Sequence, residues 1–443
     1  MHAWVKPPAF APVLAMLLLN NAMPGAPKTK IARFSYGDEI DTTLHKEGRL
    51  SSKDAIERSF QYLRDHGFTT IYWRMYWEGH PADSILSFNL TQMSQFALAA
   101  KEFEGTPYAW KPHEIAWPVE VAHRLGLKFY AWIVPFNGEG TPPGFYHEYA
   151  ARSFGKFLGE QPERRFRYWR AVKDPTNSFL VYETEFPYQS KFVHDHPEYQ
   201  AVDRSGKRYH YGILEWAYPE ARNYWLNDIK AIVDNYAVDG LYIDTRVELM
   251  GPEYADQYGF NEPVVKEFQK RYQVNILEED FDIEKWRALR GEYFTLFLRE
   301  ISELVHARRK LLSLGTARGE YIGYPIGNMK LEWRKWISEK IVDEFHVDEY
   351  GWGWGPQGYG YVTDYATGRG LKPLDVAVRE DYGPLCRSHG VKLYFACSPY
   401  RPRPISDECC AGRPTPNGIR VPADWCERMA SLPEFDGEIA RRP

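Results

Sequence analysis

The sequence predicts an α/β fold, a (β/α)8 TIM barrel with a long insertion after strand 3 and no clear eighth helix. Short β-rich runs alternate with amphipathic segments of helical length, which is the pattern of a parallel sheet. Eight such runs favour a closed barrel over an open sheet. No glycine-rich dinucleotide or phosphate loop follows any of them, which argues against a dinucleotide-binding sheet.

The predicted strands are short runs of apolar and β-branched residues. They span residues 30–36, 69–77, 127–135, 238–245, 312–318, 341–350, 391–398 and 435–440. The predicted helices carry apolar residues at three- and four-residue spacing, and Gly67 and Gly126 end two of them. They span residues 52–66, 113–125, 219–236, 263–273, 284–310, 330–340, 374–389 and 423–431. Because the chain ends at Pro443, we expect no eighth helix.

The N-terminus predicts a signal peptide over residues 1–27. Lys6 precedes an apolar run from Ala9 to Leu19 that is too short to span a bilayer, and small residues follow it. The alternative is an apolar N-terminal tail. We expect residues 28–443 to form a single TIM-barrel catalytic domain. The protein would then be secreted or periplasmic, with no membrane insertion after signal removal.

Composition limits the partners of this domain. The formal charge is -5 and no block of Lys and Arg occurs, so we expect no nucleic-acid partner. The chain has 15 Trp, 31 Tyr and 24 Phe, more than a core needs, and aromatic rings beside Gly and Pro suit sugar stacking. All 5 cysteines lie near the C-terminus, and an odd number leaves at least one unpaired. The sequence predicts neither their pairing nor the oligomeric state.

The connection after the third strand, about residues 137–217, is very long. It leaves from the C-terminal face of the barrel, where substrate-binding loops belong. Residues 194–199 are rich in aromatic and charged side chains, and residues 203–207 predict a turn. We expect the insertion to be an ordered lid or a wall of the cleft.

Three segments carry a likeness to a known family. They are His196-Pro197-Glu198-Tyr199 with residues 202–207, then residues 218–224, and residues 235–244. In this order they resemble the glycosyl-hydrolase-like family 10 proteins, a group of TIM barrels predicted to act on glycosides. The resemblance implies a barrel and a carbohydrate substrate, and implies little about which sugar.

Strand alternation predicts which side chains point into the barrel. Tyr242 and Asp244 should point inward on the fourth strand, and Thr316 on the fifth. Inward and loop positions at the same end give the expected substrate-binding residues. They are Arg33, Arg74, Tyr76, Trp132, Arg246, Arg318, Glu320, His346, Trp352, Trp354 and Tyr400. The arginines would bind an acidic sugar or neutralise the carboxylates.

Glycoside hydrolysis usually needs two carboxyl groups, an acid and a nucleophile or base. Asp244 is the predicted nucleophile or base, and its alternative role is a salt bridge to a nearby arginine. Asp348 is the predicted acid, with Glu349 as the other choice. The predicted function is a glycoside hydrolase that cleaves O-glycosidic bonds of a poly- or oligosaccharide.

Two other functions remain open. A non-catalytic carbohydrate-binding barrel would keep the aromatic cleft without a working acid pair. A metal-dependent hydrolase would need clustered histidines, but no H-E-x-x-H motif occurs and no histidine pair marks a strand end. A serine triad lacks its G-x-S-x-G elbow. We therefore expect no metal and no cofactor.

Overall fold

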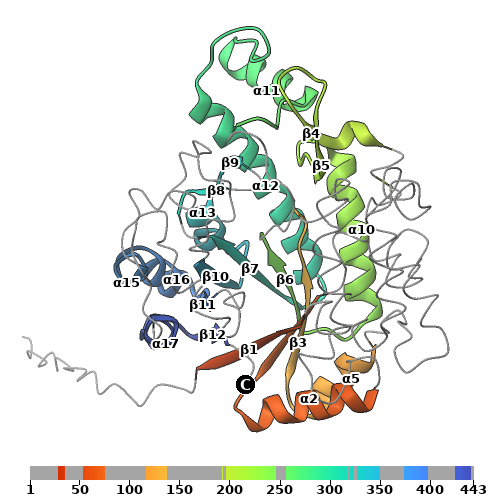
Figure 1. Ribbon diagram of the computed structural model, residues 1–443, viewed down its shortest axis with the longest axis vertical. Coiled ribbons are helices and arrows are strands. Elements are labelled where there is room, and N and C mark those ends of the chain that lie inside the picture. The colour runs from red at the N-terminus through yellow and green to blue at the C-terminus, as the bar shows by residue number, and fades with distance from the viewer. Residues whose placement is uncertain are drawn as a thin grey trace, which may run out of the picture.

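The computed structural model describes residues 28–34, 53–74, 116–136, 192, 196–245, 256–317, 319–323, 327–349, 374–397 and 425–440. Their main feature is a closed barrel of parallel strands in the order β1-β12-β11-β10-β7-β6-β3-β2 (Figure 1). The barrel strands are β1 (Thr29–Phe34), β2 (Thr70–Arg74), β3 (Lys128–Ile133), β6 (Gly240–Asp244), β7 (Leu311–Ala317), β10 (Glu344–Glu349), β11 (Lys392–Cys397) and β12 (Gly437–Ile439). The predicted TIM barrel is confirmed.

Helices cover the outside of this barrel, with α10 and α12 running along it (Figure 1). They are α2 (Lys53–Asp65), α5 (Ala116–Arg124), α10 (Pro219–Asn235), α11 (Glu262–Tyr272), α12 (Ile283–His306), α13 (Trp333–Ser338), α15 (Leu374–Ala377), the π-helical turn η4 (Val378–Tyr382), α16 (Gly383–His389) and α17 (Trp425–Ala430). On α2, Ile56, Phe60 and Leu63 recur at three- and four-residue spacing and are buried. They pack in one apolar core with outward strand residues such as Ile71 and Trp73. Full burial of one such side chain contributes about 1.5–3 kcal/mol.

Two features departed from the predicted elements. Two antiparallel hairpins occur beside the barrel, β4 (Gln200–Val202) with β5 (Tyr209–Leu214) and β8 (Tyr321–Gly323) with β9 (Gly327–Lys330). The predicted turn at residues 203–207 joins the first hairpin. The inward assignment of Thr316 was wrong, because Thr316 alternates with Gly315 and shares the face of Leu312 and Leu314, which belong to the outer core.

The inward residues lie in layers contributed by alternate strands, as is typical of this fold. We number the layers from the N-terminal end of the barrel, using the pairing registers of the described residues. Layer 1 holds Thr70, Gly240, Glu344 and Gly437, layer 2 holds Ile31, Tyr130, Ser313 and Tyr394, and layer 3 holds Tyr72, Tyr242, His346 and Ile439. Layer 4 holds Arg33, Trp132, Gly315 and Ala396, and layer 5 holds Arg74 and Asp244, with Asp348 at the matching register position. Layers 4 and 5 form the mouth of the barrel.

An aspartate precedes three of the four strands that contribute layer 1. Asp239 donates its backbone N–H to the carbonyl of Phe129, and its carboxylate accepts the N–H of the same residue at 2.8 Å. Asp343 makes this pair of bonds with Leu312 of β7, again with a 2.8 Å carboxylate contact. Each aspartate is therefore bonded to both the N–H and the carbonyl of the second residue of the preceding barrel strand.

The same device recurs where the ring closes. Asp436 makes both bonds with Leu393 of β11, at 2.8 Å for the carboxylate. On the fourth strand of the set, Thr69 holds the equivalent place and donates its N–H to the carbonyl of Lys30. A threonine hydroxyl donates to that carbonyl instead of accepting an N–H. The N-terminal end of the barrel thus has a fourfold repeat in which one member differs.

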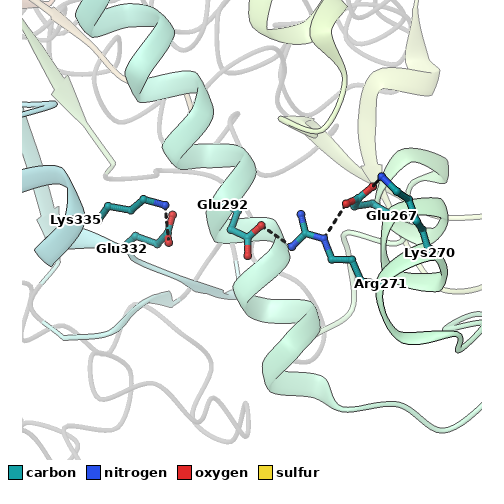
Figure 2. Close-up of polar contacts among 6 residues, drawn as sticks. All are labelled: Glu267, Lys270, Arg271, Glu292, Glu332 and Lys335. Carbon is teal, nitrogen blue, oxygen red and sulfur yellow. Dashed lines mark hydrogen bonds and ion pairs between the residues drawn. The ribbon is translucent and has the colours of Figure 1, made fainter. Parts of the chain in front are cut away.

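The hairpin β4–β5, helix α11 and the first turns of α12 form a small unit at one end of the molecule (Figure 1). Its apolar cluster comprises Ala217, Phe260, Val264, Phe268, Ile276, Trp286 and Leu289. Arg271 of α11 bonds Glu267 at 2.8 Å and Glu292 of α12 at 2.7 Å, as Figure 2 shows. Such exposed ion pairs are worth at most about 1 kcal/mol, so the apolar cluster holds the unit together.

A buried ion pair joins the end of β5 to α12 within this unit. Glu215 follows β5, Arg290 lies on α12, and 3.5 Å separates their charged atoms, with side chains only 3% and 4% exposed. Burial raises the pKa of Glu215, and the charge of Arg290 opposes that rise. Gly259 packs directly on the guanidinium, where a Cβ would lie 2.2 Å from Nε of Arg290.

The described residues also bear on the cysteines, on membrane-spanning helices and on metal sites. Cys386 is a buried free thiol, and burial raises its pKa to about 12; the side chains of the other cysteines and residues 1–27 lie outside the described residues. No helix in the described part of the chain is long and apolar enough to cross a membrane. Within that same part, no group of three or more His, Cys, Asp or Glu side chains could hold a metal ion.

Candidate functional site

Asp244 lies at the barrel mouth, as predicted. It is the last residue of β6, and alternation along this strand places Leu241 and Ile243 in the outer core and Asp244 inside. Nη1 of Arg33 lies 3.7 Å from Oδ2 of Asp244, and the two side chains are 4% and 1% exposed. Arg33 therefore neutralises a carboxylate, which is one of the two roles expected for the inward arginines.

Trp132 joins the two described arginines of the mouth. The guanidinium carbon of Arg33 lies 5.5 Å from the centroid of the Trp132 ring, and that of Arg74 lies at the same distance. The ring is 2% exposed. These cation–π contacts orient both guanidinium groups, so Trp132 serves as a support under the mouth in this structure.

The structure brings together Arg33, Arg74, Trp132 and Asp244 from the predicted site. β10 carries the backbone of Asp348 and Glu349 to the same end, but their side chains lie outside the described residues, as do Tyr76, Arg246, Arg318, Trp352, Trp354 and Tyr400. Glu320 binds elsewhere. Its carboxylate accepts from Nε1 of Trp333 at 3.3 Å and from Arg334 at 2.7 Å, both on α13.

The spacing of the two predicted carboxyl groups follows from register. Asp244 and Asp348 pair with residues of β7 on its two sides, Gly315 and Ala317. Adjacent strands lie about 4.8 Å apart, so two strands separated by one neighbour lie roughly 10 Å apart. Side chains that converge from such positions can span the separations of roughly 5–9.5 Å that glycosidases use.

His346 lies below the mouth, in layer 3. It is fully buried, and its Nε2 contacts Oη of Tyr72 at 3.0 Å and Oγ of Ser313 at 2.8 Å. Burial lowers the pKa of His346 well below its usual value, and the charge of Arg33 lowers it further. The imidazole is therefore neutral, and the structure places it inside the barrel below the expected substrate site.

Glu344, in layer 1, was missed by the sequence analysis. Its carboxyl group accepts hydrogen bonds from the hydroxyls of Tyr130 at 3.2 Å, Tyr394 at 3.4 Å and Tyr72 at 3.5 Å. Burial raises the pKa of Glu344, and Lys392 opposes the rise. Extending the alternation of β10 by one pair of residues, from His346 back to Glu344, would have found it.

No family model matches the chain, and no curated protein matches it. The resemblance to the glycosyl-hydrolase-like family 10 proteins therefore stays a prediction. The barrel itself is established by its strand order.

Solved structures match at low identity. The beta-galactosidase of the psychrophilic Marinomonas ef1 is 13% identical, with 84% of this chain and 48% of that chain covered and a TM-score of 0.44. Alpha-L-fucosidase isoenzyme 2 of Paenibacillus thiaminolyticus is 10% identical, with 84% of this chain and 40% of that chain covered and a TM-score of 0.41. The PgaB (BpsB) glycoside hydrolase domain of Bordetella bronchiseptica is 10% identical, with 94% of each chain covered and a TM-score of 0.45. The chain spans less than half the length of the first two.

Proposed function

We propose that this barrel is a glycoside hydrolase that acts on a poly- or oligosaccharide. Asp244 is its nucleophile or base, and Asp348, or Glu349 beside it, is its acid. The observation that carries the proposal is the place of Asp244, an inward carboxylate in the layer nearest the mouth of a TIM barrel, where the catalytic residues of this fold lie. Register puts Asp348 in the same layer, on the next strand but one.

Arg33 has a defined part in this mechanism. Its contact with Oδ2 fixes the orientation of the Asp244 carboxylate. The ring of Trp132 orients the guanidinium of Arg33 in turn, and the guanidinium of Arg74 contacts the same ring. A carboxylate held in this way suits attack on an anomeric carbon or activation of water. Tyr76, Arg246, Arg318, Trp352, Trp354 and Tyr400 complete the proposed cleft.

The buried pair of Arg33 and Asp244 also suits a barrel that binds carbohydrate without cleaving it, because such a pair stabilises the mouth by itself. A panel of neutral and uronate-containing polysaccharides, assayed for new reducing ends with wild type and Asp244→Asn, separates the two functions. We expect cleavage of at least one polysaccharide by wild type and none by the variant. Binding of a polysaccharide without any new reducing ends would contradict hydrolysis.

A further inference from the structure

One nitrogen of the buried imidazole of His346 has no hydrogen-bond partner in the described part of the chain. Nε2 faces the hydroxyls of Tyr72 and Ser313, whereas Nδ1 is buried and has no hydrogen-bond partner among the described residues. Leaving such an atom unsatisfied is destabilising, because it loses its bonds to water on burial. Buried polar atoms of native proteins are therefore nearly always bonded to protein or to ordered water.

His346 has two small residues in layer 4, the next layer toward the mouth. Its pairing partner on β7 is Gly315, and the layer-4 residue of β11 is Ala396, so two of the four side chains of layer 4 are hydrogen or methyl. The hydroxyl of Tyr242 lies over Gly315, where a Cβ would be 2.2 Å from it. Polar groups thus meet at this point, which a water site requires.

The network below indicates which proton the imidazole carries. The hydroxyl of Tyr72 donates to Glu344, and a Ser313 hydroxyl bond to the same carboxyl lowers the pKa of Glu344. With both protons directed to Glu344, the two hydroxyl oxygens accept from Nε2–H of His346. A neutral imidazole with its proton on Nε2 has a lone pair on Nδ1, which makes Nδ1 an acceptor.

We propose that Nδ1 of His346 accepts a hydrogen bond from an enclosed water molecule between Gly315 and Ala396, and that this water supports the carboxylate of Asp244 in the layer above. Arg33 and Trp132, the other members of layer 4, are almost fully buried and close the position from the cleft. Water therefore fits this place better than a hydroxyl of the sugar. The role of His346 as a positioning residue rests on the proposed function, whereas the water site itself does not.

The site is tested first without any assay of activity. A crystal structure at a resolution that shows ordered water should place one about 2.7–3.2 Å from Nδ1 of His346. Nitrogen-15 NMR of histidine-labelled protein should show the proton of His346 on Nε2. A crystal structure in which Nδ1 contacts only carbon atoms, or a spectrum with the proton on Nδ1, would overturn the proposal.

Substitution of Ala396 tests the link to Asp244. Ala396→Val should displace the water and lower kcat about tenfold at unchanged KM, on whichever polysaccharide wild type cleaves. Ala396→Ser, whose hydroxyl can replace the water at Nδ1, should keep most of the activity and should fold even if the valine variant does not. Val347→Ala on the outer face of β10 is the matched control, since it weakens packing on the opposite face of the strand from the water. Equal loss of kcat in Ala396→Val and Val347→Ala, or a serine variant as poor as the valine variant, would contradict the positioning role.

These results separate failure of this inference from failure of the proposed function. If Asp244→Asn remains fully active, hydrolysis by Asp244 is wrong while the crystal and NMR results still decide the water site. If Asp244→Asn is inactive and no water lies at Nδ1, only the inference about His346 is wrong.

Discussion

Glu344 shows how a single residue in the barrel interior makes stability depend on pH. Its carboxyl lies among three tyrosine hydroxyls, Ser313 and the neutral His346, with Lys392 and Lys128 as the nearby cations. Because burial raises the folded-state pKa of Glu344 above its unfolded value, the folded protein holds this proton more tightly. The stability gained is complete below the unfolded pKa and is lost as pH rises through the folded pKa.

Glu344→Gln removes this titration and keeps a side chain that can accept the tyrosine hydrogen bonds. We expect the free energy of unfolding of the variant to rise relative to that of wild type as pH increases from about 4 to 8, by about 1.4 kcal/mol for each unit of pKa shift removed. Thermal unfolding across this pH range measures it. A difference between the two proteins that stays constant with pH would show that Glu344 does not titrate as described.

Single residues also show where sequence reasoning stops. Alternation alone identified the inward positions of Tyr242 and His346, since each lies between residues of the outer core. It also identified Arg74 and Asp244, which follow the outer-core residues Trp73 and Ile243. It did not identify Glu344 as a network residue. The tyrosines that bond it lie 214, 272 and 50 positions away in sequence, and no local pattern reports such contacts.

At the scale of elements, the aspartates just before β6, β10 and β12 link neighbouring strands, because each carboxylate accepts a backbone N–H of the adjacent strand. Thr69 holds the fourth position of this repeat, and its hydroxyl donates to the carbonyl of Lys30 where the aspartates accept an N–H. Thr69 is exposed, so a carboxylate there would keep its hydration on one side. The repeat therefore marks a position where the barrel can be stabilised.

We expect Thr69→Asp to stabilise the protein by about 0.5–1.5 kcal/mol, since a carboxylate could accept the N–H of Lys30 as its counterparts do. Asp343→Ala is the reverse test and should cost about 1.5–3 kcal/mol, because it removes the charged acceptor of the Leu312 N–H. Urea unfolding measures both. A Thr69→Asp variant less stable than wild type would contradict the equivalence of the four positions.

The ion pair of Glu215 and Arg290 links the end of β5 to α12, in the unit formed by β4, β5, α11 and the first turns of α12. Arg290→Leu should destabilise the protein by about 3–5 kcal/mol, because it leaves the carboxylate of Glu215 buried without its partner. Arg290→Leu combined with Glu215→Leu should recover most of that loss. Unfolding free energies of the single and double variants test this, and a double variant as unstable as the single one would disprove it.

Elements were predictable to the extent that local periodicity defines them. The helix over residues 219–236 and the strand over 238–245 were found within a few residues, because each has a regular apolar face. The hairpin β8–β9 was missed because its strands span only three and four residues. The unit around α11 was missed because residues near 217 and 286 share its core, and their contact depends on the tertiary fold.

At the scale of the whole molecule, closure of the barrel determines which side chains lie at its mouth. The registers stack layers of inward residues, and the polarity of these layers changes along the barrel axis. Tyrosines, Glu344 and His346 fill the lower layers, whereas the arginines and Asp244 lie in layers 4 and 5. The fold class was predictable from alternation of strands and helices. The site was predictable only for residues on strands, since a loop residue has no periodicity to place it.

The measurement that tests the central claim most directly compares two aspartates at opposite ends of β6. Asp244→Asn and Asp239→Asn each remove one carboxylate, at the mouth and at the N-terminal end of the same strand. On a polysaccharide that wild type cleaves, we predict that Asp244→Asn lowers kcat/KM by about 10²–10⁴-fold and that Asp239→Asn changes it less than about threefold. Equal activity of Asp244→Asn and wild type, with both variants folded, would contradict a catalytic role for Asp244.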